Sequence, residues 1–204
     1  VLADGGLLEL GGKAIDGDEG PDLLGVIVGS EGTLGLVVGI TLGVVRQPEV
    51  VVTQLAAFSS IDAAGDAVSR VVAAGILPAA MEIMDSVTIE AAEAAYGPPY
   101  PEGARSVLLV ELDGVAPQVG VDSQAGDAIC RAAGAFELRT ASDPEDRARL
   151  WLGRKGAFAA MGRVSPDFYV QEGVVPRTRL PAVLRRIDEL SAEHGLRVGN
   201  VFHA

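Results

Sequence analysis

Arg154 is the residue whose type and position point most directly to chemistry. It follows Trp151 by three places in a segment expected to be helical, so both side chains lie on one side of that helix. A guanidinium binds a carboxylate through two parallel hydrogen bonds, and we predict that Arg154 holds the carboxylate of a small acid. The alternative is a solvated basic face near the end of the helix, formed by Arg147, Arg149, Arg154 and Lys155.

A second candidate is the glycine-rich turn Gly29-Ser30-Glu31-Gly32-Thr33-Leu34-Gly35, which separates two apolar runs. Glycines let backbone amides approach a ligand closely, and the hydroxyls of Ser30 and Thr33 are available to donate hydrogen bonds to it. Glu31 either bonds to the ligand or satisfies amides of the turn itself. The alternative is a purely structural turn, because glycine-rich turns between strands are common.

The remaining polar candidates are few. Tyr169 lies in a segment expected to be a strand, where it is either a core tyrosine with its hydroxyl at the surface or a contact to the substrate. His194 precedes Gly195 and is expected at a helix C-terminus, and Cys130 is expected to be a small buried hydrophobe. One cysteine and two histidines cannot build a zinc cage.

The composition narrows the class of protein. A formal charge of -12 over 204 residues argues against nucleic acid as a partner, because phosphate binding needs clustered Lys and Arg. The single cysteine indicates a reducing compartment, and we expect a cytoplasmic protein, with peripheral attachment to a membrane left open. The apolar runs are too short to span a membrane. The sequence starts with Val1 and stops within an expected strand, so we expect a piece truncated at both ends.

The first 48 residues are expected to form about four strands and no helix. A hairpin is predicted over residues 1–12, a polar loop over 13–21, and strands over 24–28 and 36–45. The pattern of expected elements changes after Pro48, where strands and helices begin to alternate. We therefore place a domain boundary between residues 48 and 49.

The later residues favour an α+β fold. Strands are expected over 50–58, 79–84, 106–112, 136–140, 167–175 and 197–203, with helices capped by Ser59 and ending at Gly75, and over 86–96, 121–133, 144–161 and 180–195. The glycine-rich turn of a nucleotide-binding parallel sheet is missing between them. The order therefore favours a ferredoxin-like antiparallel sheet with helices on one face.

Six motifs in fixed order carry a resemblance to a known family. They are LADGGLLELGGKA and DLLGVIVGSEGTLGLV near the start, AMEIMD at 80–85, LWLGRKGAF at 150–158, SPDFYVQEGVVPR at 165–177 and NVFHA at the end. Together they resemble FAD-linked oxidases related to vanillyl-alcohol oxidase, in the branch that contains the glycolate oxidase flavoprotein subunit and D-lactate dehydrogenases. The resemblance covers essentially the whole sequence.

The resemblance implies roles for the candidate residues. It implies that residues 1–48 are the C-terminal remnant of a FAD-binding domain, whose Gly29–Gly35 turn contacts FAD, and that 49–204 are a substrate or cap domain, incomplete at its end. Arg154 is then the substrate-carboxylate residue. His203 is implied to ligate a divalent metal or to lie beside the substrate hydroxyl, with a second histidine of the motif further on, and we assign it as catalytic and metal-binding.

Two functions remain open at this point. The first is FAD-dependent oxidation of a small 2-hydroxy acid, such as glycolate or D-lactate, with the flavin reoxidised by oxygen or by an iron–sulfur electron-transfer subunit. In this case Tyr169 is a second substrate contact, and the 204 residues alone are expected to be inactive. The alternative is a non-catalytic subunit or binding module that keeps the cap fold without a working flavin site.

Overall fold

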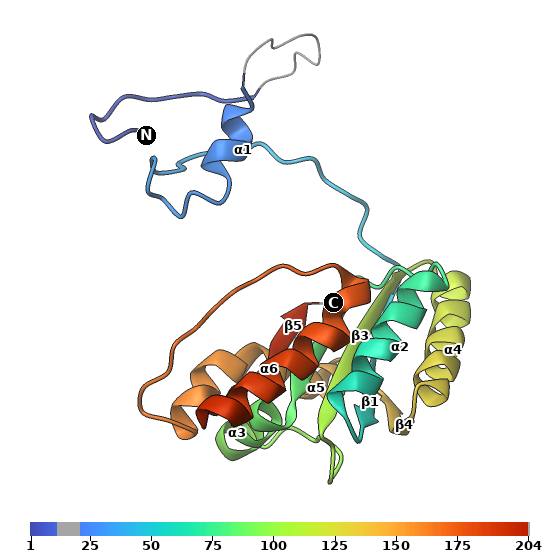
Figure 1. The fold of residues 1–204 in the computed structure, drawn as a ribbon. Coiled ribbons are helices and arrows are strands. Elements are labelled where there is room, and N and C mark those ends of the chain that lie inside the picture. The colour runs from blue at the N-terminus through green and yellow to red at the C-terminus, as the bar shows by residue number, and fades with distance from the viewer. Residues whose placement is uncertain (12–20, 204) are drawn as a thin grey trace. The chain divides into compact units, whose positions relative to one another are not determined.

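The computed structural model describes residues 1–11 and 21–203 of a chain that divides into two units. The first unit is Val1–Arg46 and the second is Gln47–Ala204 (Figure 1). All strands found in the described ranges belong to the second unit. Within those ranges, no helix has the length and apolar character needed to cross a membrane.

Helices and strands alternate over most of the second unit, and the first unit contributes one short helix, α1. In chain order the described elements of both units are α1 (Leu23–Ile27), β1 (Val50–Phe58), α2 (Ile61–Ala73), β2 (Ala80–Asp85), α3 (Ser86–Tyr96), β3 (Ser106–Gly114), α4 (Ala116–Ala132), β4 (Ala135–Thr140), α5 (Pro144–Ala160), η1 (Met161–Arg163), η2 (Arg177–Arg179), α6 (Leu180–His194) and β5 (Val201–His203).

A single five-stranded sheet with the order β4-β1-β3-β2-β5 forms the centre of the second unit. All neighbouring strands are antiparallel. The first four strands, with α2 and α4 as crossovers, have the ferredoxin-like order, which confirms the predicted α+β class. The fifth strand pairs with β2 and brings His203 directly opposite Glu82.

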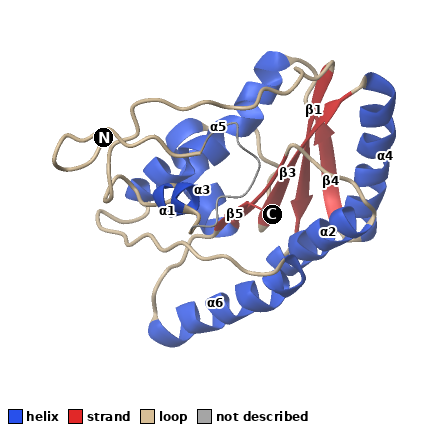
Figure 2. Cartoon of the chain, turned by 90° about the horizontal axis from the view of Figure 1, so that it is seen from above, coloured by secondary structure: helices blue, strands red, loops and turns tan. Residues whose placement is uncertain are grey.

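Helices cover both faces of this sheet, so the prediction of helices on one face is wrong. Residues of α2, α4 and α6 pack on the face that carries Phe58 and Leu108. Residues of α3 and α5 pack on the opposite face, which carries Leu55 and Leu109 (Figure 2). Because side chains alternate along a strand, β1 and β3 are buried on both faces, and the apolar run of β3 is typical of such strands.

Local capping explains where the helices begin. Ser60, rather than the predicted Ser59, accepts a hydrogen bond from the Ala63 amide at the start of α2. Asp143 caps α5 with Pro144 as the next residue, as its sequence predicts. The helix expected from residue 121 already begins at Ala116, without a side-chain cap, and the proline in its first turn is compatible with this start.

The first unit differs from its prediction. Residues 24–27 lie in the helix α1 instead of a strand, and Val28 follows it in a turn. The Asp22 carboxylate caps this helix by accepting from the Gly25 amide at 2.9 Å. The described residues of the expected hairpin form a turn, and residues 36–45 form no strand. Their side chains are exposed, Val44 by 94%, so no second layer stabilises them as a strand. The polar loop predicted over 13–21 lies, apart from Pro21, outside the described residues.

The strand predicted over 167–175 is also wrong. These residues contain no helix or strand and are mostly exposed. Phe168 instead packs edge-on against Phe158 of α5, with 5.5 Å between ring centroids. The residues of this segment alternate as in a strand, but no strand pairs with them in the described structure. A strand needs such a neighbour, because its backbone groups find their hydrogen-bond partners there.

Candidate functional site

Helix α5 lies against the sheet and determines where Arg154 points. Trp151 Nε1 donates to Oε2 of Glu111 on β3 at 2.8 Å, and the Thr53 hydroxyl on β1 donates to the same oxygen at 2.6 Å. Lys155 lies over the Trp151 ring, 5.9 Å from its centroid. The Arg154 side chain is only 18% exposed, so it faces the sheet and does not belong to a solvated basic face.

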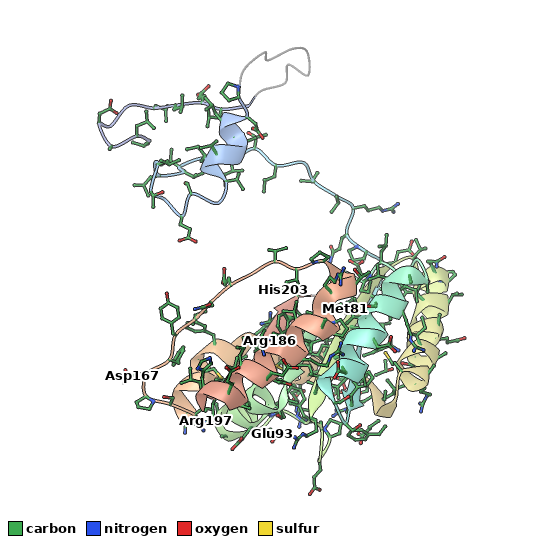
Figure 3. The ribbon with its side chains drawn as sticks, viewed as in Figure 1. Met81, Glu93, Asp167, Arg186, Arg197 and His203 are labelled. Atoms are coloured by element: carbon green, nitrogen blue, oxygen red, sulfur yellow. The ribbon has the colours of Figure 1, made fainter. Side chains whose placement is uncertain are left out.

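Arg154 meets Glu82 and His203 in a three-residue cluster, which joins α5, β2 and β5. Its Nε donates to Glu82 Oε2 at 2.9 Å, and its Nη2 lies 3.3 Å from Nε2 of His203. Nδ1 of the same ring lies 2.6 Å from Glu82 Oε1. The Glu82 side chain is 7% exposed and that of His203, which is labelled in Figure 3, is 84% exposed. The cluster therefore runs from a buried carboxylate to an exposed imidazole.

A buried hydrogen-bond network fixes the start of the segment that carries His203. Asp85 Oδ1 accepts from the Thr88 amide, which caps α3, and Oδ2 accepts from both the backbone and side-chain nitrogens of Asn200 at 2.7 and 2.8 Å. Burial raises the pKa of Asp85, and the hydrogen bonds from Thr88 and Asn200 oppose this shift. The network attaches the chain three residues before His203 to the end of β2.

Tyr169 does not join this cluster. Its side chain is 86% exposed in the segment where the predicted strand is absent. In the described part of the chain, no hydrogen bond links Tyr169 to Arg154 or to His203. Its role as a substrate contact stays a prediction, and the alternative of a core tyrosine does not fit its exposure.

The Gly29–Gly35 turn is an open segment of the first unit. Gly29 and Gly32 have positive φ angles of 84° and 77°, and nothing lies within 4 Å of a Cβ placed on either. The Thr33 hydroxyl donates to the carbonyl oxygen of Ser30 at 2.6 Å, so its hydrogen is used inside the turn and is not free as predicted. The backbone at Gly29 and Gly32 is unobstructed, which fits the close approach of a ligand, whereas a Cβ on Gly35 would lie 3.0 Å from the Val1 carbonyl oxygen.

The described residues offer no ready metal centre. They contain no group of three or more His, Cys, Asp or Glu side chains that could hold a metal ion. The divalent-metal role of His203 therefore stays a prediction.

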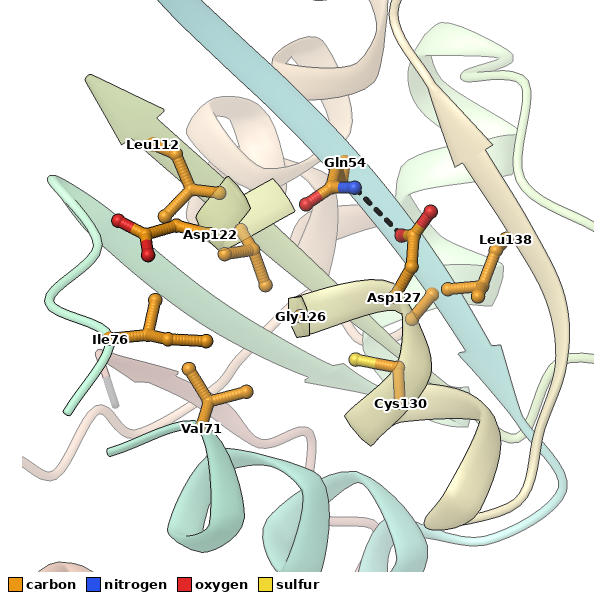
Figure 4. A pocket seen from close by; sticks show the side chains of 11 residues that line it. Gln54, Val71, Ile76, Leu112, Asp122, Gly126, Asp127, Cys130 and Leu138 are labelled. Carbon is orange, nitrogen blue, oxygen red and sulfur yellow. Dashed lines mark hydrogen bonds between the residues drawn. The ribbon is translucent and has the colours of Figure 1, made fainter. Parts of the chain in front are cut away.

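A small pocket lies on the other side of the sheet, between the strands β1, β3 and β4 and the helices α2 and α4 (Figure 4). Gln54 donates to Asp127 Oδ1 across it at 2.7 Å, and burial raises the pKa of Asp127. Cys130, which is buried as predicted, also lines the pocket. The pocket contains none of the residues predicted to act on substrate or cofactor.

Comparison with models of protein families shows which family the chain belongs to. Residues 47–204 match the family of "FAD linked oxidases, C-terminal domain". The chain belongs to this family. The resemblance to the glycolate oxidase and D-lactate dehydrogenase branch is thereby confirmed, and the ferredoxin-like sheet is the scaffold of this FAD linked oxidase C-terminal domain.

Individual relatives place the domain more closely. The chain is 45% identical over 98% of its length to the glycolate oxidase subunit GlcD of Escherichia coli K12 and 34% identical over its whole length to the GlcD of Bacillus subtilis. It is 28% identical to a D-lactate dehydrogenase of Archaeoglobus fulgidus. The chain spans 40%, 43% and 44% of these three relatives, respectively.

A solved structure shares the fold at low sequence identity. An alkyldihydroxyacetonephosphate synthase superposes with a TM-score of 0.62 over 86% of this chain and 37% of its own, at 17% identity. This likeness concerns the fold of the FAD linked oxidase C-terminal domain alone.

Sequence reasoning missed Glu82, although the residue lies within the quoted AMEIMD motif. The sequence pattern that could have indicated Glu82 is a carboxylate between apolar neighbours in a short strand. An ionised group on a buried strand face needs a partner of opposite charge, so such a residue points to an ion pair. The strand pattern alone does not say which cation that partner is.

Proposed function

We propose that the protein containing this chain oxidises a small 2-hydroxy acid to the 2-oxo acid, with the hydride passing to FAD. The observation that carries this proposal is the 3.3 Å separation between Arg154 Nη2 and His203 Nε2. A 2-hydroxy acid bears its hydroxyl on the carbon next to its carboxylate, so the groups that bind them must be neighbours. Two residues 49 positions apart in the sequence meet this requirement.

Arg154 supplies the carboxylate site in this proposal. Its Nε is bonded to Glu82, whereas its Nη1 makes no hydrogen bond to any described residue. The outer edge, formed by Nη1 and Nη2, can accept a carboxylate through two parallel hydrogen bonds. Binding there leaves the hydroxyl of the acid on the side of His203.

His203 acts on the hydroxyl. As C2 of the substrate loses a hydride, its hydroxyl loses a proton, and in this proposal the lone pair of His203 Nε2 takes that proton. When bound, FAD supplies the hydride acceptor. The open Gly29–Gly35 turn is proposed to contact FAD through its backbone, and no step above depends on a metal.

The relatives' names support the proposal and do not favour a non-catalytic module. Two are named as subunits of a glycolate oxidase and a third as a D-lactate dehydrogenase. We also propose that a partner subunit accepts electrons from the reduced flavin. That this subunit holds an iron–sulfur cluster, and which 2-hydroxy acid is the substrate, stay predictions.

The test is anaerobic flavin reduction in the FAD-loaded protein. Bleaching of the flavin by glycolate or D-lactate is expected in the unaltered protein. Arg154→Gln should lower kcat/KM about 100-fold, because a charged bidentate contact contributes about 3 kcal/mol. Arg149→Gln, with the same charge change on the same helix, serves as the matched control. Equal effects of the two variants, or a flavin that no 2-hydroxy acid reduces, would refute the proposal.

A further inference from the structure

Glu82 is a buried carboxylate with a partner on each oxygen. Its Oε2 accepts from Arg154 Nε at 2.9 Å, and its Oε1 lies 2.6 Å from His203 Nδ1. An ionised carboxylate on a largely buried strand face is costly unless its charge is paired and hydrogen-bonded. Both partners are therefore held to this one side chain.

The hydrogen-bonding capacity of the three groups determines the tautomer of His203. A guanidinium carries only donors, so in the contact between Arg154 Nη2 and His203 Nε2 the ring nitrogen must accept. The hydrogen of the neutral ring then resides on Nδ1, where it is donated to Glu82 Oε1. This arrangement leaves the lone pair at Nε2.

Strand register places the ring where this can happen. Glu82 and His203 are directly opposite each other in the β2 and β5 pair, where facing side chains are neighbours. A slip of one residue would move the imidazole to the other face of the sheet, away from Arg154. The same register therefore brings together the carboxylate, the ring and the guanidinium.

We propose that Glu82 is a positioning residue that serves both groups of the site at once. Its Oε1 holds His203 as the Nδ1–H tautomer, so Nε2 keeps the lone pair that accepts from Arg154 Nη2 in the free site and from the substrate hydroxyl once substrate is bound. Its Oε2 orients Arg154 so that Nη1 and Nη2 remain available to the carboxylate. That these two contacts serve catalysis rests on the proposed function. The contacts of Glu82 with His203 and Arg154 can be measured without substrate.

The first experiment reads the tautomer directly. Long-range ¹H–¹⁵N spectra of the histidine-labelled 204-residue chain, recorded at a pH where the ring is neutral, distinguish hydrogen on Nδ1 from hydrogen on Nε2. The second histidine, His194, provides an internal reference. The unaltered chain should show the Nδ1–H form at His203, and Glu82→Gln should shift it toward the Nε2–H form and move the Arg154 Nε–H signal.

Glu111→Gln is the matched control. Glu111 is also a carboxylate on the same sheet face, and it also accepts from α5, but through Trp151. Its substitution should leave the His203 tautomer and the Arg154 signal unchanged. Glu82→Asp covers the case in which Glu82→Gln does not fold, because the shorter side chain cannot reach both partners. An unchanged tautomer in either folded Glu82 variant would overturn the inference.

The second experiment uses the FAD-loaded protein with a 2-hydroxy acid. Glu82→Gln should lower kcat/KM by about tenfold or more relative to Glu111→Gln, as expected for a group that orients another ligand-binding residue. If the unaltered protein oxidises no 2-hydroxy acid, the proposed function fails while the tautomer result stands. If it is active and Glu82→Gln matches Glu111→Gln, the positioning role fails.

Discussion

Replacing Asp85 by Ala tests whether the segment that carries His203 is held by a buried network. The Asp85 carboxylate caps α3 through the Thr88 amide and accepts two hydrogen bonds from Asn200. Asn200 is 6% exposed, so water cannot readily replace the lost acceptor. The substitution therefore removes a helix cap and leaves two buried donors of Asn200 unsatisfied.

The expected loss of unfolding free energy is about 3 kcal/mol. Loss of a helix cap costs about 1 kcal/mol, and a buried donor left without a partner costs about 1–3 kcal/mol. One gain offsets part of this, since burial raises the pKa of Asp85 and removing the carboxyl group removes the cost of burying its charge. One cap and two unsatisfied donors together cost about 3–7 kcal/mol, and we therefore expect a value near the lower end of that range.

Urea unfolding followed by fluorescence of Trp151, which is the single tryptophan, measures this loss. Ser60→Ala is the control, because it deletes the N-cap of α2 without a second buried partner and should cost about 1 kcal/mol. In the double variant Asp85→Ala/Asn200→Ala, the two losses should be less than additive. An Asp85→Ala loss no greater than that of Ser60→Ala would refute the reasoning.

The pH dependence gives an independent check on the same carboxyl group. A folded-state pKa above the ordinary carboxyl value of 3.8 means that the folded chain binds the proton more tightly than the unfolded chain. The contribution to stability is therefore complete below about pH 3.8 and is lost as the pH rises through the folded-state pKa. The stability difference between the unaltered chain and Asp85→Ala should accordingly be larger in acid.

Two further predictions concern α5 and α4. Gly153→Ala should lower the free energy of unfolding by about 1–3 kcal/mol, because a Cβ there would come closer than 3.0 Å to the buried Tyr100. Gly120→Ala, with nothing within 4 Å of the added Cβ, should raise it by about 0.5–1 kcal/mol. Urea unfolding measures both changes, and a change of the same sign in the two variants would contradict the close packing at Gly153. Burial, with a smaller effect of Asp127, raises the pKa of Cys130 to about 12. The thiol is therefore protonated at pH 8, and a thiol reagent should modify it only on unfolding, so rapid labelling of the folded chain would contradict its burial.

The sequence predicted most of the second unit because each element there carries its own local signal. Alternation or apolar runs mark the strands, and Asp143 with Pro144 marks the start of α5. The coverage of both sheet faces was not predicted, although the apolar run of β3 is compatible with burial on both sides. Which face each helix packs against depends on the path of the chain, which periodicity does not encode.

The predictions failed where an expected strand has no partner. Apolar residues at 36–45 and alternation at 167–175 satisfy the local criteria for strands, but the structure places neither segment beside another strand. A strand acquires its hydrogen bonds only from a neighbour, unlike a helix, whose bonds are internal. Sequence patterns are for this reason weaker predictors of strands than of helices such as α6.

The candidate site shows the same limit at the level of side chains. Arg154 was predicted from its helix position and the family resemblance, and His203 from the resemblance alone. Their contact with Glu82 could not be predicted, because it depends on the pairing of β2 with β5 and on the packing of α5 against the sheet. Tyr169, predicted from an expected strand, lies in a segment without one.

The edge position of β5 links stability to function. Among residues 1–11 and 21–203, this strand has three residues and one neighbour, β2, so few backbone hydrogen bonds of the sheet hold His203 there. The bonds between Asp85 and Asn200 hold the chain just before the first residue of β5, and Glu82 holds the ring of its last residue, His203. A local opening of β5 would therefore separate His203 from Arg154 before the rest of the sheet unfolds. Substitutions in the buried network should consequently reduce activity at temperatures where Trp151 fluorescence still reports a folded chain.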